Sequence, residues 1–153
     1  MTTDVRNYTS RRSNILTALA EKLKDIDGSG RILTDLQNNV SPRLKFWDEV
    51  VDFPAIHLNA GAETRQYQGG GYKDRFLSII IRCYVNDEDN STEALNLLME
   101  DVETVVEENS RLQYADPQNR TFHTQQISII SINTDEGVLE PLGVGEMLIE
   151  VRY

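Results

Sequence analysis

Residues 73–86 read KDRFLSIIIRCYVN and give the strongest strand signal in the chain. One face of this segment is apolar throughout: Leu77, Ile79, Ile81, Cys83 and Val85. The opposite face is mixed: Phe76, Ser78, Ile80, Arg82 and Tyr84. This alternation is typical of an antiparallel strand that packs one face against helices, while the other face is partly open or covered by a partner.

Two amphipathic segments supply the helices for that apolar face. The first spans residues 11–26 and begins near a capping serine, Ser10 or Ser13. Its apolar residues fall in one helical stripe: Ile15, Leu16, Leu19, Leu23 and Ile26. The second spans residues 92–109, after Asn90 as a predicted N-cap. Its stripe is Leu95, Leu98, Met99, Val102, Val105 and Val106.

The remaining segments predict further strands and one ambiguous region. Apolar alternation and β-branched residues favour strands at residues 55–59, 63–68, 121–134 and 144–153. Residues 31–53 give a mixed signal, with one short helical turn over residues 46–51. Trp47 is expected to anchor the segment 43–51 in the core. The element order predicts an α+β fold, a mainly antiparallel sheet with two helices packed on one face. We expect residues 1–10 to form a flexible N-terminal arm and residues 11–153 a single domain.

Composition excludes several function classes. The 153 residues include 25 acidic and 15 basic side chains, so the formal charge is −10. A chain this acidic repels phosphates on average, which argues against binding nucleic acid by charge neutralisation. No apolar run approaches the roughly 20 residues that span a bilayer. The single cysteine, Cys83, excludes an internal disulfide and a multi-cysteine metal site.

Catalytic signatures are missing from the sequence. His57 and His123 lack metal-ligand spacing, and Cys83 lies on an apolar strand face where a thiol is inert. The triple glycine at 69–71 precedes a strand, whereas a phosphate-binding loop follows one. Residues 87–89 lack the spacing of a calcium loop. We therefore predict no enzyme activity, no cofactor and no bound metal.

Two surfaces leave alternatives open. The polar face of the 92–109 helix is acidic: Glu93, Glu100, Asp101, Glu103 and Glu107. This face is either simply solvated or a negative wall along a path for DNA. On the mixed face of the central strand, Phe76, Ile80 and Tyr84 would form an exposed apolar patch, and such patches usually bind a partner. Alternatively, residues 31–53 fold over that patch.

The pattern as a whole resembles a known family. Its elements are an N-terminal helix, the strand start Phe53-Pro54-Ala55-Ile56, the segment Glu63-Thr64-Arg65-Gln66-Tyr67, a glycine-rich loop, the long strand 75–85, an acidic turn, a helix and two closing strands. Over residues 11–153 this order resembles the tail terminator proteins of long-tailed bacteriophages, also called tail completion or head–tail joining proteins.

The resemblance implies a structural virion protein of the tail or neck, assembled in the host cytoplasm. It implies a hexameric ring of identical subunits that caps the tail tube and joins it to the head, with DNA passing through the centre without specific binding. The implied partners are further copies of the chain, the tail tube protein and the neck or connector protein, with the sheath as a further candidate and no membrane. The interface candidates are Tyr67, Tyr72, Phe76, Ile80, Arg82 and Tyr84.

Three other functions remain open from the residues alone. One is another neck, connector or minor tail protein. Another is a non-viral ligand- or protein-binding module, for which we expect a monomer or dimer with a defined apolar pocket. The third is an enzyme that uses carboxylates, although no acidic pair is singled out.

Overall fold

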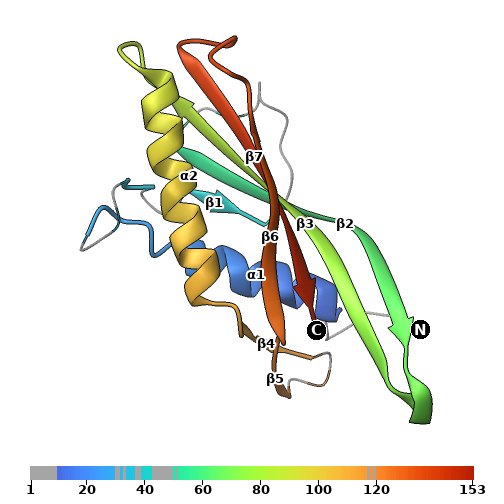
Figure 1. Ribbon diagram of the computed structural model, residues 1–153. Coiled ribbons are helices and arrows are strands. Elements are labelled where there is room, and N and C mark those ends of the chain that lie inside the picture. The colour runs from blue at the N-terminus through green and yellow to red at the C-terminus, as the bar shows by residue number, and fades with distance from the viewer. Residues whose placement is uncertain are drawn as a thin grey trace, which may run out of the picture.

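The computed structural model describes residues 10–29, 32, 34–36, 39–42, 50, 52–116, 118 and 120–153. Its elements in chain order are α1 (Arg11–Leu23), β1 (Val40–Ser41), β2 (Ala55–Tyr67), the short 3-10 turn η2 (Gly69–Gly71), β3 (Lys73–Asn86), α2 (Ser91–Glu108), β4 (Gln113–Ala115), β5 (Thr121–His123), β6 (Gln126–Thr134) and β7 (Leu142–Arg152). Both helices pack on one face of the main sheet (Figure 1). The predicted α+β architecture is therefore confirmed.

The main sheet has five strands in the order β1-β2-β3-β7-β6. The short β1 runs parallel to β2, and all the other neighbours are antiparallel. Strands β4 and β5 form a separate two-stranded hairpin at the end of the molecule where α1 begins (Figure 1). The edges of the described sheet are thus β6 on one side and β1 with the uncovered part of β2 on the other.

The central strand β3 shows the predicted division between its two faces. Leu77, Ile79, Ile81 and Cys83 are fully buried on the helix side. Every residue from Phe76 to Asn86 has a β7 partner, and β2 pairs along the other side of β3. Burial of apolar side chains such as these is the main favourable contribution to folding.

Two glycines of β7, Gly143 and Gly145, leave room for α2 to pack on the sheet without a side chain between them. A Cβ at Gly143 would lie 2.7 Å from Val85 Cγ2 and 3.3 Å from the carbonyl oxygen of Ser91. A Cβ at Gly145 would lie 2.9 Å from the Met99 sulfur. Asn90 is the N-cap of the helix, as predicted: its side-chain oxygen accepts the Glu93 N–H at 3.1 Å. Because Gly143 and Gly145 have no side chains, α2 packs directly against β7 at these two positions, and this contact fixes the position of the helix.

Helix α1 is shorter than predicted. Its start is correct, since Ser10 Oγ accepts the Ser13 N–H at 3.1 Å. It ends at Leu23 rather than at residue 26, and a turn follows. Ile26 is nevertheless fully buried, and its carbonyl oxygen accepts the Leu36 N–H at 3.0 Å. The buried stripe therefore extends three residues beyond the helix, where the backbone of Ile26 is hydrogen-bonded to Leu36 instead of to a further helical turn.

The strand boundaries also differ from those predicted. The two pieces at 55–59 and 63–68 form one strand, β2, with a bulge between Ala60 and Glu63. The single strand at 121–134 is two strands, because the chain leaves β5 at Thr124 and begins β6 at Gln126. Strand β4 was not predicted, and β7 begins at Leu142 rather than at residue 144. Two predictions fall outside the described residues. They are the flexible N-terminus, except for Ser10, and the helical turn at 46–51 with Trp47, except for Val50.

Candidate functional site

The hairpin of β2 and β3 carries two exposed tyrosines at its tip. Strand β3 pairs with β7 only from Phe76 onward, so the end of the hairpin projects beyond the sheet (Figure 1). Tyr67 and Tyr72 are 73% and 75% exposed there. The Gln68 N–H donates to the Tyr72 carbonyl at 2.7 Å, and Gly70 and Gly71 adopt the positive φ angles that this turn needs. We call this projecting end of the hairpin, residues 65–75, the arm. Rigid aromatic side chains on it are suited to contact a partner.

The open face of β3 holds the other four predicted interface residues. Arg82 is anchored across three strands, since its Nε donates to Glu146 Oε1 at 3.0 Å and its Nη1 to Asn59 Oδ1 at 2.8 Å. Ile80 lies beside Leu148 of β7 and is partly exposed. The sheet pairing therefore places charged and apolar groups in a fixed order on the face away from the helices.

Phe76 and Tyr84, the first and last of these four residues, differ in exposure. The ring of Phe76 is partly exposed and lies 5.8 Å from the guanidinium of Arg152, which pairs with Asp74 at 2.9 Å. Tyr84 is only 5% exposed, and its ring lies 5.0 Å from that of His57. Burial raises the pKa of Tyr84. The structure brings Phe76, Ile80 and Arg82 together as accessible groups, whereas Tyr84 packs into the protein.

The root of the arm is held by a cluster of aromatic and arginine side chains. The Tyr153 hydroxyl donates to the Glu63 carboxylate, and the Arg11 guanidinium lies 5.0 Å from the Tyr153 ring. Arg11 also donates from Nη2 to the Tyr114 hydroxyl at 2.6 Å. Burial tends to raise the pKa of Glu63, but hydrogen bonds from Tyr153 and Arg65 outweigh it and leave that pKa lowered. These contacts connect α1, β4, Tyr153 and β2, so the part of β2 from which the arm projects is held in place.

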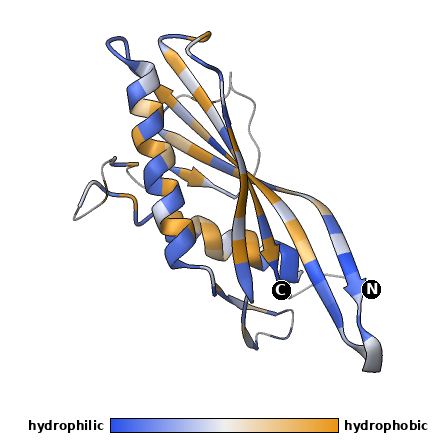
Figure 2. Ribbon diagram, viewed as in Figure 1, coloured by the Kyte–Doolittle hydropathy of each residue, from blue (hydrophilic) through white to orange (hydrophobic). Residues whose placement is uncertain are grey.

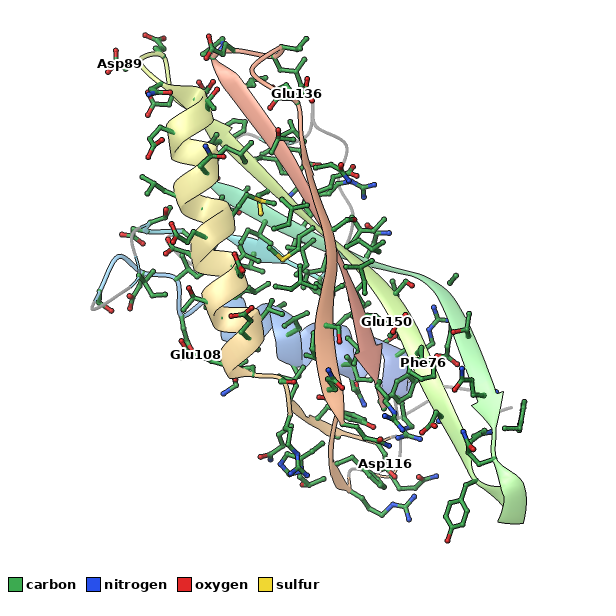
Figure 3. All side chains as sticks on the ribbon, in the orientation of Figure 1. Phe76, Asp89, Glu108, Asp116, Glu136 and Glu150 are labelled. Atoms are coloured by element: carbon green, nitrogen blue, oxygen red, sulfur yellow. The ribbon has the colours of Figure 1, made fainter. Side chains whose placement is uncertain are left out.

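Further exposed apolar side chains were not among the predicted interface residues. Ile130 and Ile132 on β6 are 54% and 44% exposed, and Val138 and Leu139 in the β6–β7 turn are 80% and 48% exposed. That turn adjoins the start of α2, because the Asp87 N–H donates to the Pro141 carbonyl at 2.9 Å. Figure 3 shows Asp89 and Glu136 together at this end of the molecule and Asp116 at the other end. One sequence feature could have indicated an exposed apolar surface on β6: residues 126–134 have no charge, in a chain with 26% charged residues.

The acidic face of α2 is smaller than predicted. Asp101 is 2% exposed, and its Oδ2 accepts the Thr34 N–H at 2.7 Å. This carboxylate is therefore a structural acceptor rather than part of a solvated wall. Glu93, Glu100 and Glu107 remain exposed on the helix.

The residues considered for catalysis lie apart from one another. His57 is buried in β2, whereas His123 is exposed in β5. Burial raises the pKa of the Cys83 thiol to about 12, so it stays protonated and unreactive near neutral pH. Within the described ranges, no three histidine, cysteine or acidic side chains are grouped to hold a metal ion. Nor does that part of the chain contain a helix long and apolar enough to cross a bilayer.

Comparisons with known proteins point to one family. Residues 9–153 match the family model described as Bacteriophage Tail Tube Terminator Protein. The chain is 32% identical over 149 residues to the tail tube terminator protein p142 of Escherichia phage T5, covering 93% of this chain and 92% of that protein. A chain in the virion of a native gene transfer agent particle has a similar fold, with a TM-score of 0.59 at 7% identity. That match covers 92% of this chain and 95% of the other.

Proposed function

The chain belongs to the bacteriophage tail tube terminator protein family, and on this premise we propose that six copies form a closed ring on the end of the tail tube. As a member of this family it is a structural component of the virion tail and not an enzyme. The ring would stop tube growth and present a docking surface to the neck or connector. The observation that carries the proposal is the family match, which includes every described element from α1 to β7.

The difference between the two sheet edges supports a ring rather than a simple dimer. The uncovered part of β2 lies at one edge of the described sheet, and the exposed isoleucines of β6 lie at the other. A two-fold dimer joins the same patch on both copies, whereas a ring joins two different patches. Two different sheet edges on one subunit fit the second arrangement.

The arm is suited to reach a neighbouring layer of the tail. It extends past the end of β7 along the strand direction (Figure 1). If the ring axis runs along the strands, the six arms point out of the ring plane. Tyr67 and Tyr72 would then meet the tail tube or the neck. Tyrosine supplies large contact area at low conformational cost, which favours this role.

Passage of DNA through the ring requires weak adhesion. The formal charge of −10 per chain makes the ring repel phosphates on average. A ring of this charge would let the polymer slide, because tight binding to DNA depends on many lysine and arginine contacts to phosphate.

The test is the state of assembly of the purified chain, alone and with tail tubes. Light scattering and negative-stain images should show rings of six times 17.4 kDa with a central hole, and these rings should attach to tube ends. Replacing Tyr72 with alanine should reduce attachment without dissolving the ring, and Lys73→Ala, at the neighbouring exposed position, is the matched control. A strict monomer at all salt and protein concentrations, also in the presence of tubes, would overturn the proposal.

A further inference from the structure

We propose that the ring closes by strand addition: the outer edge of β6 in each subunit pairs antiparallel with the outer edge of β2 in the next. This inference rests on the proposed ring and names the contact between its subunits. The occupant of each free edge is therefore a second copy of this chain.

The outer edge of β6 carries neither charge nor proline, and its one protective feature is a bulge between Ile129 and Ser131. Its inner side pairs with β7, and no described strand pairs with its outer side. The Ile127 N–H donates to Ser110 Oγ at 3.2 Å, which leaves 128–134 as the open stretch. Residues 126–134 contain no charged residue and no proline, and the middle of β6 is coloured as hydrophobic in Figure 2. Ile130 and Ile132 of this strand are exposed. Monomeric proteins normally protect such edges with charge, proline or short length, because a bare edge pairs with other chains.

The outer edge of β2 offers a matching strand at the opposite side of the sheet. Strand β1 pairs only with Ile56 and His57, and in the described part of the chain no strand follows along 58–67. The part of this stretch that lies level with β6 runs from residue 58 to residue 64, because Thr64, Phe76, Arg152 and Gln126 lie side by side across the sheet. Arg12 Nη2 donates to the Gly61 carbonyl at 2.7 Å, which steadies the bulge in the middle of the strand. Among the residues that the structure describes, each edge of the sheet therefore has a stretch that no neighbouring strand covers.

The strand directions decide how the two edges meet. Strands β2, β3, β7 and β6 are antiparallel neighbours in turn, so β6 runs opposite to β2. Rotation about an axis along the strands leaves every strand direction unchanged. The β6 strand of one subunit therefore meets the β2 strand of the next in the antiparallel sense, which continues the alternation of the sheet with well-aligned hydrogen bonds. The same edges could not close a ring by pairing β6 with β6, because that contact is two-fold and ends after two copies.

Electrostatics also favours this contact between subunits. Copies that each carry −10 repel one another, so a stable contact must avoid concentrating negative charge. Strand β6 contributes no charge. On β2, the Glu63 carboxylate already pairs with Arg65 at 2.9 Å and accepts the Tyr153 hydroxyl. The two edges thus approach with little net charge between them.

Disulfide trapping tests the pairing directly. Ser128 and Ser131 on β6 and Asn59 and Thr64 on β2 all lie on the face away from the helices and at the level of β6. Two preparations, one with a cysteine at a β6 position and one with a cysteine at a β2 position, should form a covalent heterodimer when mixed and mildly oxidised. With both cysteines in one chain, the products should form a ladder up to six subunits. The native Cys83 is fully buried and gives no background, and Asn96→Cys on the exposed face of α2 is the matched control.

The possible outcomes separate this inference from the ring itself. Covalent dimers of Ser131→Cys alone would show β6–β6 pairing and overturn the inference. Intact rings in which none of the four β6–β2 combinations cross-links would overturn it while leaving the ring standing. Failure of the unmodified chain to form rings would overturn both.

A second pair of variants measures the energetic importance of the edge. Ile132→Lys places a charge on the open stretch of β6 and should raise the ring dissociation constant about tenfold or more. Asn96→Lys makes the same change in charge on the exposed face of α2 and should alter it by less than about twofold. Equal effects of the two variants would show that net charge, and not the β6 edge, controls assembly.

Discussion

Strands β3 and β6 are both rich in isoleucine but place it in opposite environments. In β3, Ile79 and Ile81 are fully buried, because β2 and β7 pair on either side and the helices cover the face. In β6, Ile130 and Ile132 are about half exposed, because β7 is the one described neighbour. The same side chain therefore stabilises the subunit in the centre of the sheet and is available for assembly at its edge.

The largest expected effect is on the buried centre. Ile81→Ala removes a side chain held between Leu58 and Met147, and should lower the free energy of unfolding by about 2–5 kcal/mol. Ile80→Ala on the opposite face of the same strand is the control, with a smaller loss because Ile80 is partly exposed. Denaturant titration of both variants measures the difference. Equal losses would mean that the two faces of β3 are equally important for stability.

Adding one carbon beneath α2 tests how tightly the covered side of the sheet is packed. Gly143→Ala should lower the free energy of unfolding by about 1–3 kcal/mol, because the new methyl group meets Val85 and the Ser91 backbone. Gly145→Ala should cost less, since its nearest obstacle is the flexible end of Met99. The comparison uses the same denaturant titration. The reverse order would contradict the close approach of α2 to Gly143.

The base of the arm gives an effect that depends on pH. Burial, and then the hydrogen bond to Glu63, raise the pKa of Tyr153 to about 12 from its ordinary value of 10. The protonated hydroxyl is favoured in the folded state, so its contribution is complete below pH 10 and is lost as pH rises from 10 to 12. Two pKa units correspond to about 3 kcal/mol, and solvent screening of the hydroxyl lowers the expected loss to about 2 kcal/mol or less.

Tyr153→Phe removes the titrating group and should flatten this alkaline decline. Denaturant titrations at pH 8 and pH 11.5 compare it with the unmodified chain. A residual slope is expected, because the buried Tyr84 also has a raised pKa. An unchanged slope would show that the Tyr153–Glu63 contact does not support the arm.

The smallest effect on the subunit is expected at the edge. Ile132→Ala should change the free energy of unfolding of the dilute monomer by less than about 1 kcal/mol, because the side chain is already 44% exposed. The same variant should weaken ring formation, as measured by sedimentation at several concentrations. A loss of monomer stability as large as that of Ile81→Ala would remove the contrast between centre and edge.

The parts of the fold that depend on local pattern were predictable. Alternation in residues 73–86 predicted both faces of β3, and the Asn90 cap predicted the start of α2. The continuity of β2 was not predictable, because Gly61 and Ala62 interrupt the apolar pattern and only pairing with β3 keeps the strand together across its bulge. Asp101 looked solvated because its partner Thr34 is 67 residues away.

The candidate surfaces divide in the same way. The exposure of Tyr67 and Tyr72 follows from the glycine-rich turn between them, which is a local signal. The exposure of Ile130 and Ile132 depends on β6 being an edge strand of the described sheet, and the order of strands in a sheet is a property of non-local pairing. An uncharged strand in an acidic chain was the one hint that the sequence offered.

Amide hydrogen exchange tests the pairing of the β6 edge most directly. Residues 128–134 should exchange quickly in the dissociated subunit, while residues 77–85 of β3 exchange slowly. In assembled rings on tail tubes, the β6 amides on the outer edge should become about as protected as those of β3. Rings in which residues 128–134 still exchange as fast as in the free subunit would contradict the account.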